Sequence, residues 1–218
     1  KYHHIAYGFV YLSNKTADKL GVEVEDPNKP IKMSGRSGTV VSVDTFIKEV
    51  EESLVKKFGD FSSLKDVRNG AIKFEMLKNN TYQDMVFDLD AATDNKGFTG
   101  PYIQYTYARA LSVLRKGNRD GNLSVSSSGL NTVNEDETKL LKGINRLPGE
   151  IEFSIEELSP HYICHYMYGL AQAYNAFYNS NQIIGSECET ERLAMTQSVA
   201  NSLNLSLKLL GIEAPTSI

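Results

Sequence analysis

The stretch that decides the fold is GFTGPYIQYTYAR, which occupies residues 97–109. Two glycines in it, Gly97 and Gly100, can adopt backbone angles that other residues avoid, and Thr99 has the side chain of a helix N-cap. Pro101 suits the first turn of a helix because no amide hydrogen is required there. The pattern therefore predicts a loop that ends at Thr99 and a helix that begins directly after it.

The predicted helix has two faces. Apolar residues recur at helical spacing and are expected to be buried, namely Ile103, Tyr107, Ala110, Leu111 and Leu114. The opposite side is expected to be wetter and carries Gln104, Tyr105, Arg109, Ser112 and Lys116. A helix with one apolar stripe packs against other elements, so this one predicts a larger helical body.

The same stretch resembles the TGPY-x-QY-x-x-AR segment of arginyl-tRNA synthetases, at which a catalytic domain is followed by a helical anticodon-binding domain. A second segment, KMSGRSG at residues 32–38, is similar to the KMSKS loop of class I aminoacyl-tRNA synthetases. Small residues with Lys and Arg can bring backbone amides and positive charge to a triphosphate. Without the first stretch, a basic surface turn is an equally good interpretation of the second.

The resemblance implies ATP as a substrate, accompanied by Mg. In this sequence the ATP-binding residues would be Lys32, Met33, Ser34 and Gly35, and the residues that stabilise charge as pyrophosphate leaves would be Lys32, Ser34 and Arg36. The family often has lysine where this chain has Gly35. Arg36, or a lysine elsewhere in the full enzyme, would then supply that charge.

The C-terminal half resembles the anticodon-binding domain over its length. The matching strings are LSP at 158–160, AYNAFY at 173–178, ERL at 191–193 and LLGIEAP at 209–215. Aromatic and guanidinium planes stack on unpaired bases, and the resemblance implies tRNA contacts from Tyr102, Gln104, Tyr105, Arg109, Lys116, Asn175, Tyr178, Arg192 and Ile218. The alternative for the tyrosines is a core position with the hydroxyl at the rim.

Composition is that of an ordinary globular protein, with 41% hydrophobic and 23% charged residues in 218. The net charge of −4 argues against an indiscriminate polyanion binder, and no apolar run approaches the ~20 residues of a membrane span. Two distant cysteines, Cys164 and Cys188, favour reduced thiols in a cytoplasmic protein. His161 and His165 flank Cys164 at a spacing that could hold a metal, but without further ligands core packing is favoured and no metal site is expected.

The expected fold is mainly α. Residues 1–85 are predicted to be the end of a class I Rossmann-type catalytic domain, and residues 86–218 an all-α anticodon-binding bundle. Strands are expected over 7–12 and 39–43, a loop over 118–134, and helices over 44–58, 67–78, 136–146, 151–158, 160–178 and 189–210. Asp44 and Ser159 are expected to cap helices, and Gly59 and Gly211 to end them. Asp88 and Asp90 are interpreted as capping residues, the alternative being an acid/base pair.

Taken together, the resemblance implies a protein that joins arginine to its tRNA with ATP through an arginyl-adenylate. Because the chain opens inside a predicted strand, we expect it to be part of a longer protein whose HIGH signature precedes residue 1. His3 and His4 do not form that motif. Alone, the chain is expected to be a monomer that binds tRNA without making adenylate. The alternatives are a related synthetase such as the cysteinyl enzyme, or a non-catalytic helical interaction module.

Overall fold

The computed structural model describes residues 4–24, 26–33, 41–117 and 133–218, and these are mainly helical. In chain order the elements are β1 (Val10–Leu12), α1 (Asn14–Lys19), β2 (Ile31–Lys32), α2 (Val43–Phe58), α3 (Leu64–Leu77), β3 (Met85–Phe87), α4 (Leu89–Ala92), α5 (Gly100–Lys116), α6 (Glu135–Asn145), α7 (Leu147–Glu156), α8 (His161–Ser180) and α9 (Glu189–Leu209). The predicted fold class is confirmed.

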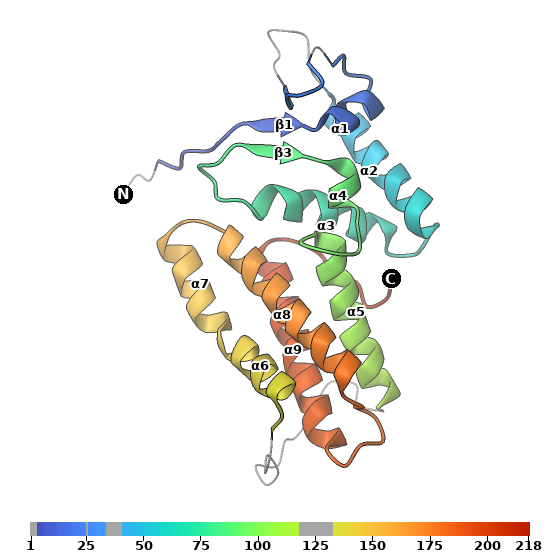
Figure 1. Ribbon diagram of the computed structural model, residues 1–218, viewed down its shortest axis with the longest axis vertical. Coiled ribbons are helices and arrows are strands. Elements are labelled where there is room, and N and C mark those ends of the chain that lie inside the picture. Colours follow the sequence, from blue (N-terminus) through green and yellow to red (C-terminus); the bar gives the residue numbers. More distant parts are fainter. Residues whose placement is uncertain (1–3, 25, 34–40, 118–132) are drawn as a thin grey trace.

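A small mixed sheet organises the first part of the chain. Its strand order is β2-β1-β3; β1 is antiparallel to β2, with Tyr11 opposite Lys32, and parallel to β3, with Val10 opposite Met85. A parallel pair needs a long crossover, and here α2 and α3 supply it (Figure 1). The core beside this sheet includes Leu12, Val50, Leu54, Val67, Phe87 and Leu89.

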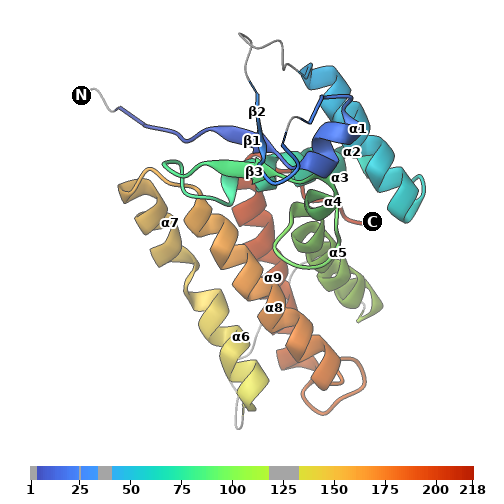
Figure 2. The ribbon, with the colours of Figure 1, turned by 45° about the horizontal axis from the view of Figure 1, so that its top comes forward.

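The second part is a helical bundle made of α5, α6, α7, α8 and α9. α5 lies along α9, and α6 lies along α8, as both ribbon views show (Figures 1 and 2). The fully buried side chains of its core include Met167, Leu170, Tyr174, Phe177, Leu193, Leu203 and Leu207. From Gly100 onward the described residues form no strand, as the sequence predicts.

Helix α3 joins the two cores. Its Val67 and Ala71 pack in the first core, whereas Phe74 packs in the bundle core. α3 and α5 approach closely, because a Cβ atom on Gly100 would lie only 2.4 Å from the carbonyl oxygen of Gly70. Glycine is required at such a separation, so α5 is seated directly on α3.

Several helix ends follow the sequence prediction. Thr99 caps α5 by accepting a hydrogen bond from the amide of Tyr102 at 3.2 Å, and Pro101 lies in the first turn. Gly59 ends α2 with φ of 80°, and Gly211 follows α9 with φ of 63°. Both glycines therefore have a positive φ, which glycine adopts without strain.

Two predicted caps are wrong. Ser42, rather than Asp44, caps α2 by accepting a hydrogen bond from the amide three residues later at 3.1 Å; Asp44 lies in the first turn, where its charge suits the helix dipole. Ser159 does not cap α8, which begins at His161 after Pro160. The Ser159 hydroxyl instead hydrogen bonds to His161 Nδ1 at 2.7 Å.

The early part of the chain departs from the prediction in two further places. Of the expected strand over residues 7–12, Val10–Leu12 form β1, although Gly8 also hydrogen bonds to Thr81, and Tyr7 is 87% exposed. Phe58, the last residue of α2, is 41% exposed. Val43 is already helical, and the beginning of the expected extended segment over 39–43 lies outside the described residues.

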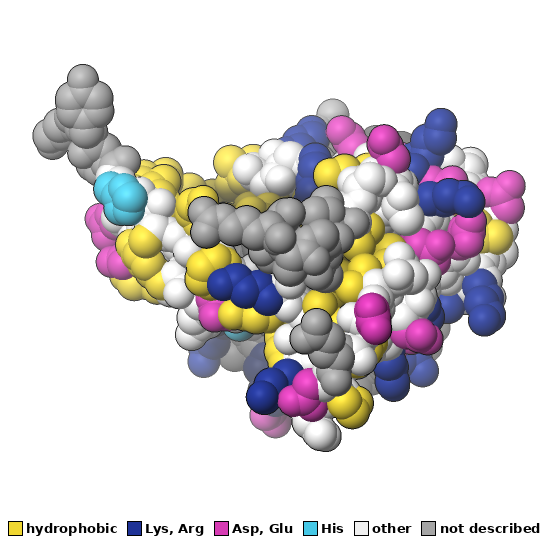
Figure 3. All heavy atoms as spheres, turned by 90° about the horizontal axis from the view of Figure 1, so that it is seen from above, with side chains coloured by type: hydrophobic (Ala, Val, Ile, Leu, Met, Phe, Trp, Pro, Cys, Tyr) yellow, Lys and Arg dark blue, Asp and Glu magenta, His cyan; other side chains and the backbone are white. Residues whose placement is uncertain are grey.

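Apolar side chains are exposed on the first part of the molecule, among them Ile5, Tyr7, Phe9, Tyr82 and Val86. Viewed from above, this end shows hydrophobic side chains between groups of Lys, Arg, Asp and Glu (Figure 3). Across the described residues, every helix falls short of the length or apolar character that a membrane crossing needs.

Candidate nucleic-acid interface

One side of α5 presents polar and aromatic side chains to solvent. Tyr105, Arg109, Ser112 and Lys116 follow one another at steps of four, three and four residues, so they lie along one stripe of the helix. Tyr105 is 37% exposed and Lys116 is exposed, while Arg109 and Ser112 are half-buried. The opposite stripe, with Ile103, Tyr107, Ala110 and Leu114, is buried as predicted.

The centre of this stripe is an arginine between two tyrosines. The guanidinium carbon of Arg109 lies 4.9 Å from the ring centroid of Tyr105 and 5.3 Å from that of Tyr178, which comes from the end of α8. Both distances are within the range of cation–π attraction. Tyr178 is 39% exposed, so both rings keep a surface available to a partner.

A hydrogen-bond network fixes the arginine. Arg109 Nη1 donates to Asn175 Oδ1 at 2.6 Å, and Asn175 Nδ2 in turn donates to the Tyr102 hydroxyl at 2.9 Å and to Thr106 Oγ1 at 3.1 Å. All four side chains belong to α5 or α8. Because the asparagine amide is oriented by two acceptors, its oxygen faces the guanidinium, and Arg109 is held before any ligand arrives.

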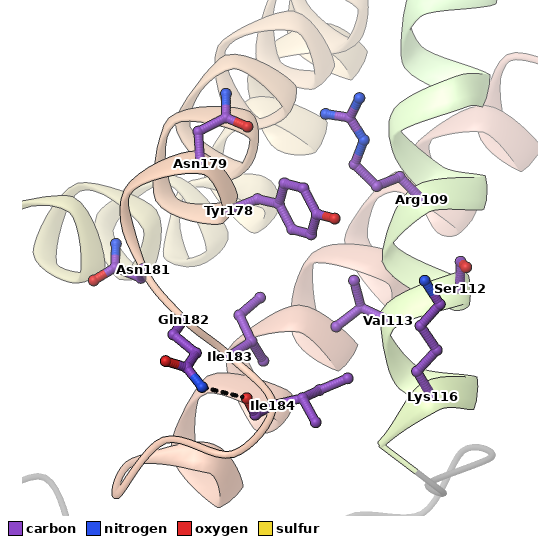
Figure 4. Close-up of a pocket in the computed structure, with 10 residues that line it drawn as sticks. All are labelled: Arg109, Ser112, Val113, Lys116, Tyr178, Asn179, Asn181, Gln182, Ile183 and Ile184. Atoms are coloured by element: carbon purple, nitrogen blue, oxygen red, sulfur yellow. Dashed lines mark hydrogen bonds between the residues drawn. The ribbon is translucent and has the colours of Figure 1, made fainter.

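A cavity of about 470 Å³ lies beside this cluster, between α5 and the segment that follows α8. Figure 4 shows Arg109 and Tyr178 projecting toward one another at one end and Lys116 on α5 at the other. Its remaining lining residues are Ser112, Val113, Asn179, Asn181, Gln182, Ile183 and Ile184. The volume is in the range of small-ligand sites, and the lining combines apolar surface, amides and positive charge.

A second, smaller cavity of about 210 Å³ lies on the other side of Tyr105. Phe58, Phe61, Val67, Asn95 and Pro101 line it together with Tyr105 and Ile218. The last residue of the chain is therefore a neighbour of the tyrosine–arginine cluster. This arrangement explains why Phe58 is exposed, since its ring faces this cavity rather than the core.

Two residues predicted to contact tRNA have a different environment. Gln104 was expected on the wetter side of the helix, and this is wrong because it is 0% exposed. Arg192 donates from Nε to Glu137 Oε1 at 2.8 Å and from Nη1 to the carbonyl oxygen of Gln182 at 2.7 Å, and its side chain is 16% exposed. Both side chains are engaged inside the protein, so we leave them out of the candidate interface.

The predicted phosphate loop is only partly described. Lys32 is exposed on β2, and its Nζ lies 3.5 Å from the ring centroid of Phe9. Met33 is 37% exposed. Ser34, Gly35 and Arg36 lie outside the described residues. The assignment of these five residues to ATP binding or catalysis stays a prediction.

The His161–Cys164–His165 cluster is packed. His161 lies 4.0 Å from the Tyr162 ring and His165 lies 4.6 Å from the Phe98 ring, centroid to centroid. Burial, and secondarily the nearby His165, lowers the pKa of His161. Cys164 is fully buried, which raises the pKa of its thiol to about 12. These contacts support the packing interpretation.

The part of the chain that carries the stripe and both cavities matches a known family. The model of the DALR anticodon binding domain matches residues 103–218, from the first turn of α5 to the end of the chain. The chain belongs to the DALR anticodon-binding domain family.

The similarity to known proteins extends beyond this DALR domain. The chain is 31% identical to an arginine–tRNA ligase of Flavobacterium psychrophilum, covering 98% of the chain and 35% of that protein. It is 31% identical to the corresponding enzyme of Ligilactobacillus salivarius, covering 99% and 37%. The solved arginyl-tRNA synthetase of Thermus thermophilus superposes with a TM-score of 0.80 at 29% identity, over 99% of the chain and 35% of that structure. The chain thus spans about a third of the length of the relatives it matches.

Within the DALR domain, the structure brings together Tyr102, Tyr105, Arg109, Asn175 and Tyr178 of the predicted set, with Lys116 lining the same cavity as Arg109 and Tyr178. Sequence reasoning missed Asn179 near the end of α8 and, in the segment that follows α8, Asn181, Gln182, Ile183 and Ile184. This segment carries no periodic signal, and only its position directly after the aromatic end of α8 could have pointed to it.

Proposed function

We propose that the Tyr105–Arg109–Tyr178 cluster and its adjacent cavity bind the anticodon loop of an arginine tRNA. The observation that carries the proposal is the arginine held between two partly exposed tyrosine rings at the rim of a 470 Å³ cavity. Aromatic rings and guanidinium planes are the surfaces on which proteins stack unpaired bases. The family match supports the anticodon as the part of the tRNA that is bound.

The lining of the cavity suits an unstacked nucleotide. The ring of Tyr178 provides stacking surface in the cavity, and Tyr105 adds a second ring beside Arg109. The amides of Asn179 and Gln182 can donate to and accept from base edges. Lys116 provides a positive charge for a phosphate. Ile218 would add an apolar contact next to Tyr105, from the second cavity.

For the whole protein we propose the reaction named in its relatives, ligation of arginine to tRNA. The arginine carboxylate would attack the α-phosphate of ATP to give arginyl-adenylate and pyrophosphate, and a tRNA hydroxyl would then displace AMP. Lys32, with Met33, Ser34, Gly35 and Arg36, would contact the phosphates and stabilise charge as pyrophosphate leaves. Among the described residues, no group of three His, Cys, Asp or Glu side chains could hold a metal ion; Mg would accompany the ATP phosphates.

Binding of purified tRNA tests the proposal directly. In a filter-binding titration at several salt concentrations, we expect the arginine tRNA to bind more tightly than the same tRNA with a changed anticodon. Equal binding of the two would favour the non-catalytic interaction module. Charging of purified tRNAs by the full-length protein separates arginine from the alternative, cysteine.

Substitutions in the cluster locate the site. Tyr105→Ala and Tyr178→Ala should each weaken binding by roughly 5- to 150-fold, the loss expected when one stacked base loses its platform. Tyr82→Ala removes a ring that is 66% exposed in the first part of the molecule and should leave affinity unchanged. Lys116→Ala should lower the slope of log affinity against log salt by about 0.7–0.9, whereas Lys208→Ala at the end of α9 should not.

We further propose that the 218-residue chain is a cytoplasmic monomer that does not form adenylate by itself. Both cysteines are free, Cys164 buried and Cys188 exposed, which suits a reducing compartment. Sedimentation checks the oligomeric state. Pyrophosphate exchange with arginine, ATP and saturating tRNA checks the activity, and measurable exchange by this chain would overturn the second part of the proposal.

A further inference from the structure

Gln104 is a fully buried polar residue that ties three segments together. It lies on α5, and its Nε2 donates to the carbonyl oxygen of Asp66 in the first turn of α3 at 3.0 Å. The same nitrogen donates to the carbonyl oxygen of Glu213, in the segment after α9, at 2.9 Å. One amide group thus uses both of its hydrogens on backbone oxygens that are about 150 residues apart in sequence. Buried polar side chains are ordinarily hydrogen-bonded, and these two carbonyl oxygens satisfy the amide nitrogen.

The side-chain amide of Gln104 is closely packed against α3. A Cβ atom on Gly70 would lie 2.4–2.6 Å from the Oε1, Nε2 and Cδ atoms of Gln104, so the amide lies flat on a glycine of α3. Gly100, one turn before Gln104 on α5, is itself in contact with the backbone of Gly70. The two glycines bring α5 close enough to α3 for a glutamine side chain to reach past it to the C-terminal segment.

Between Glu213 and Ile218, two further side-chain hydrogen bonds connect the chain to other described residues. Arg115 Nη1 donates to the carbonyl oxygen of Thr216 at 3.2 Å, and Ser63 Oγ donates to that of Ser217 at 2.7 Å. Both bonds are at the surface, where water competes for them. We call residues 213–218 the C-terminal tail. Of these three hydrogen bonds to the tail, only the one from Gln104 comes from a fully buried side chain.

The tail ends beside the proposed RNA site. Ile218 and Tyr105 line the same cavity, and Tyr105 in turn contacts the Arg109 guanidinium. Gln104 and Tyr105 are consecutive on α5, one facing inward to the tail's first carbonyl and the other outward to its last residue. A loosened tail would therefore remove one wall of the cavity next to the stacking cluster.

We propose that Gln104 is a positioning residue that seats the C-terminal tail, and so places Ile218 against Tyr105, for recognition of the tRNA. It does not touch the RNA itself. The inference rests on the proposed function, since the tail matters only if the Tyr105 cluster binds RNA. This role differs from the sequence prediction, which placed Gln104 on the solvent-facing side of the helix.

Two measurements on the same variants test it. Gln104→Met keeps the volume and removes both hydrogen bonds; Gly70→Ala keeps Gln104 and displaces its amide, and serves if the first variant does not fold. Gln197→Met is the matched control, because in the described part of the chain the Gln197 side chain bonds to its helix neighbour Asn201 and to no other segment. Release of Ile218 by a carboxypeptidase, followed by mass spectrometry, should accelerate several-fold in the first two variants and stay unchanged in the control.

Binding of the arginine tRNA completes the test. Gln104→Met should weaken affinity by about 5-fold, the equivalent of one net hydrogen bond, and this effect should vanish in a chain that lacks residues 214–218. An equal loss of affinity with and without the tail would overturn the positioning role, as would unchanged release of Ile218. If the unaltered chain ignores the anticodon, the proposed function fails, and the release assay still judges whether Gln104 seats the tail.

Discussion

Arg192 provides a quantitative test of how the bundle is held together. Its guanidinium pairs with Glu137 at 2.8 Å and also donates to the carbonyl oxygen of Gln182. Glu137 completes the capping box of α6, since its Oε2 accepts a hydrogen bond from the amide of Asn134 at 2.9 Å. Arg192→Met would remove the cation while leaving the carboxylate in place. The side chain of Glu137 is only 6% exposed, so water cannot replace the lost partner.

The expected cost follows from this geometry. Breaking a buried ion pair from one side typically costs ~3–5 kcal/mol. Arg192 is 16% exposed, which places the cost at the lower end. The amide of Asn134 and the N-terminal dipole of α6 still stabilise the carboxylate by ~0.3–1 kcal/mol. We therefore expect the free energy of unfolding to fall by about 2–3 kcal/mol. With a urea m-value of ~2–3 kcal/mol/M, the midpoint would shift by about 1 M.

Urea unfolding followed by circular dichroism measures the effect. Lys48→Met is the control, because the Lys48–Glu52 pair has side chains that are 75% and 58% exposed and should contribute no more than ~0.5 kcal/mol. Adding Glu137→Gln to Arg192→Met should restore a large part of the loss, since glutamine still accepts the cap hydrogen bond without a charge. The reasoning is refuted if Arg192→Met shifts the midpoint no more than the control does, or if the double variant recovers nothing. A loss of tRNA affinity without a loss of stability would restore Arg192 as an RNA contact.

Three further outcomes are expected. Burial raises the pKa of the Cys164 thiol to about 12, so at pH 8 roughly one Cys164 thiol in 10,000 is ionised. A thiol reagent should therefore modify only the exposed Cys188 in native protein. Rapid reaction of two thiols would contradict this. Ser42→Ala should lower the free energy of unfolding by ~1 kcal/mol through loss of the α2 cap, whereas Asp44→Ala should lower it by less than half of that. The reverse order of the urea midpoints would mean that Asp44 is the cap. Gly100→Ala places a methyl group 2.4 Å from a backbone oxygen of α3 and should lower the free energy of unfolding by ~1–3 kcal/mol. An unchanged midpoint of thermal unfolding would show that α5 and α3 can move apart at little cost.

Sequence patterns were informative where a local rule decides the structure. The Thr99 cap and the first-turn Pro101 are properties of a few neighbouring residues, and the structure has both. Asp88 caps α4 through the amide of Ala91 at 2.8 Å, as the capping interpretation favours, whereas Asp90 is not a cap and pairs with Lys19. The buried stripe of α5 also followed from its period.

Long-range packing decided the features that were missed. Periodicity gives α5 one buried stripe, but α3 and the C-terminal tail cover a second side of the helix, which is why Gln104 is buried. Arg192 and Glu137, which form an ion pair, are 55 positions apart in sequence. No local sequence pattern predicts a contact over that separation. The predicted division after residue 85 was drawn from the resemblance, whereas Phe87 and Leu89 pack in the first core. The position of that division stays a prediction.

The parallel pairing of β1 with β3 has a consequence for biosynthesis. Val10 and Met85, which lie opposite each other, are 85 − 10 = 75 residues apart, so a ribosome elongating at ~5–20 residues per second delivers the second strand ~4–15 s after the first. During that interval β2, which emerges some twenty residues behind the first strand, is available to pair with it, whereas β3 is not. The sheet is thus completed from the β2 edge, and the crossover helices must emerge before the third strand can dock.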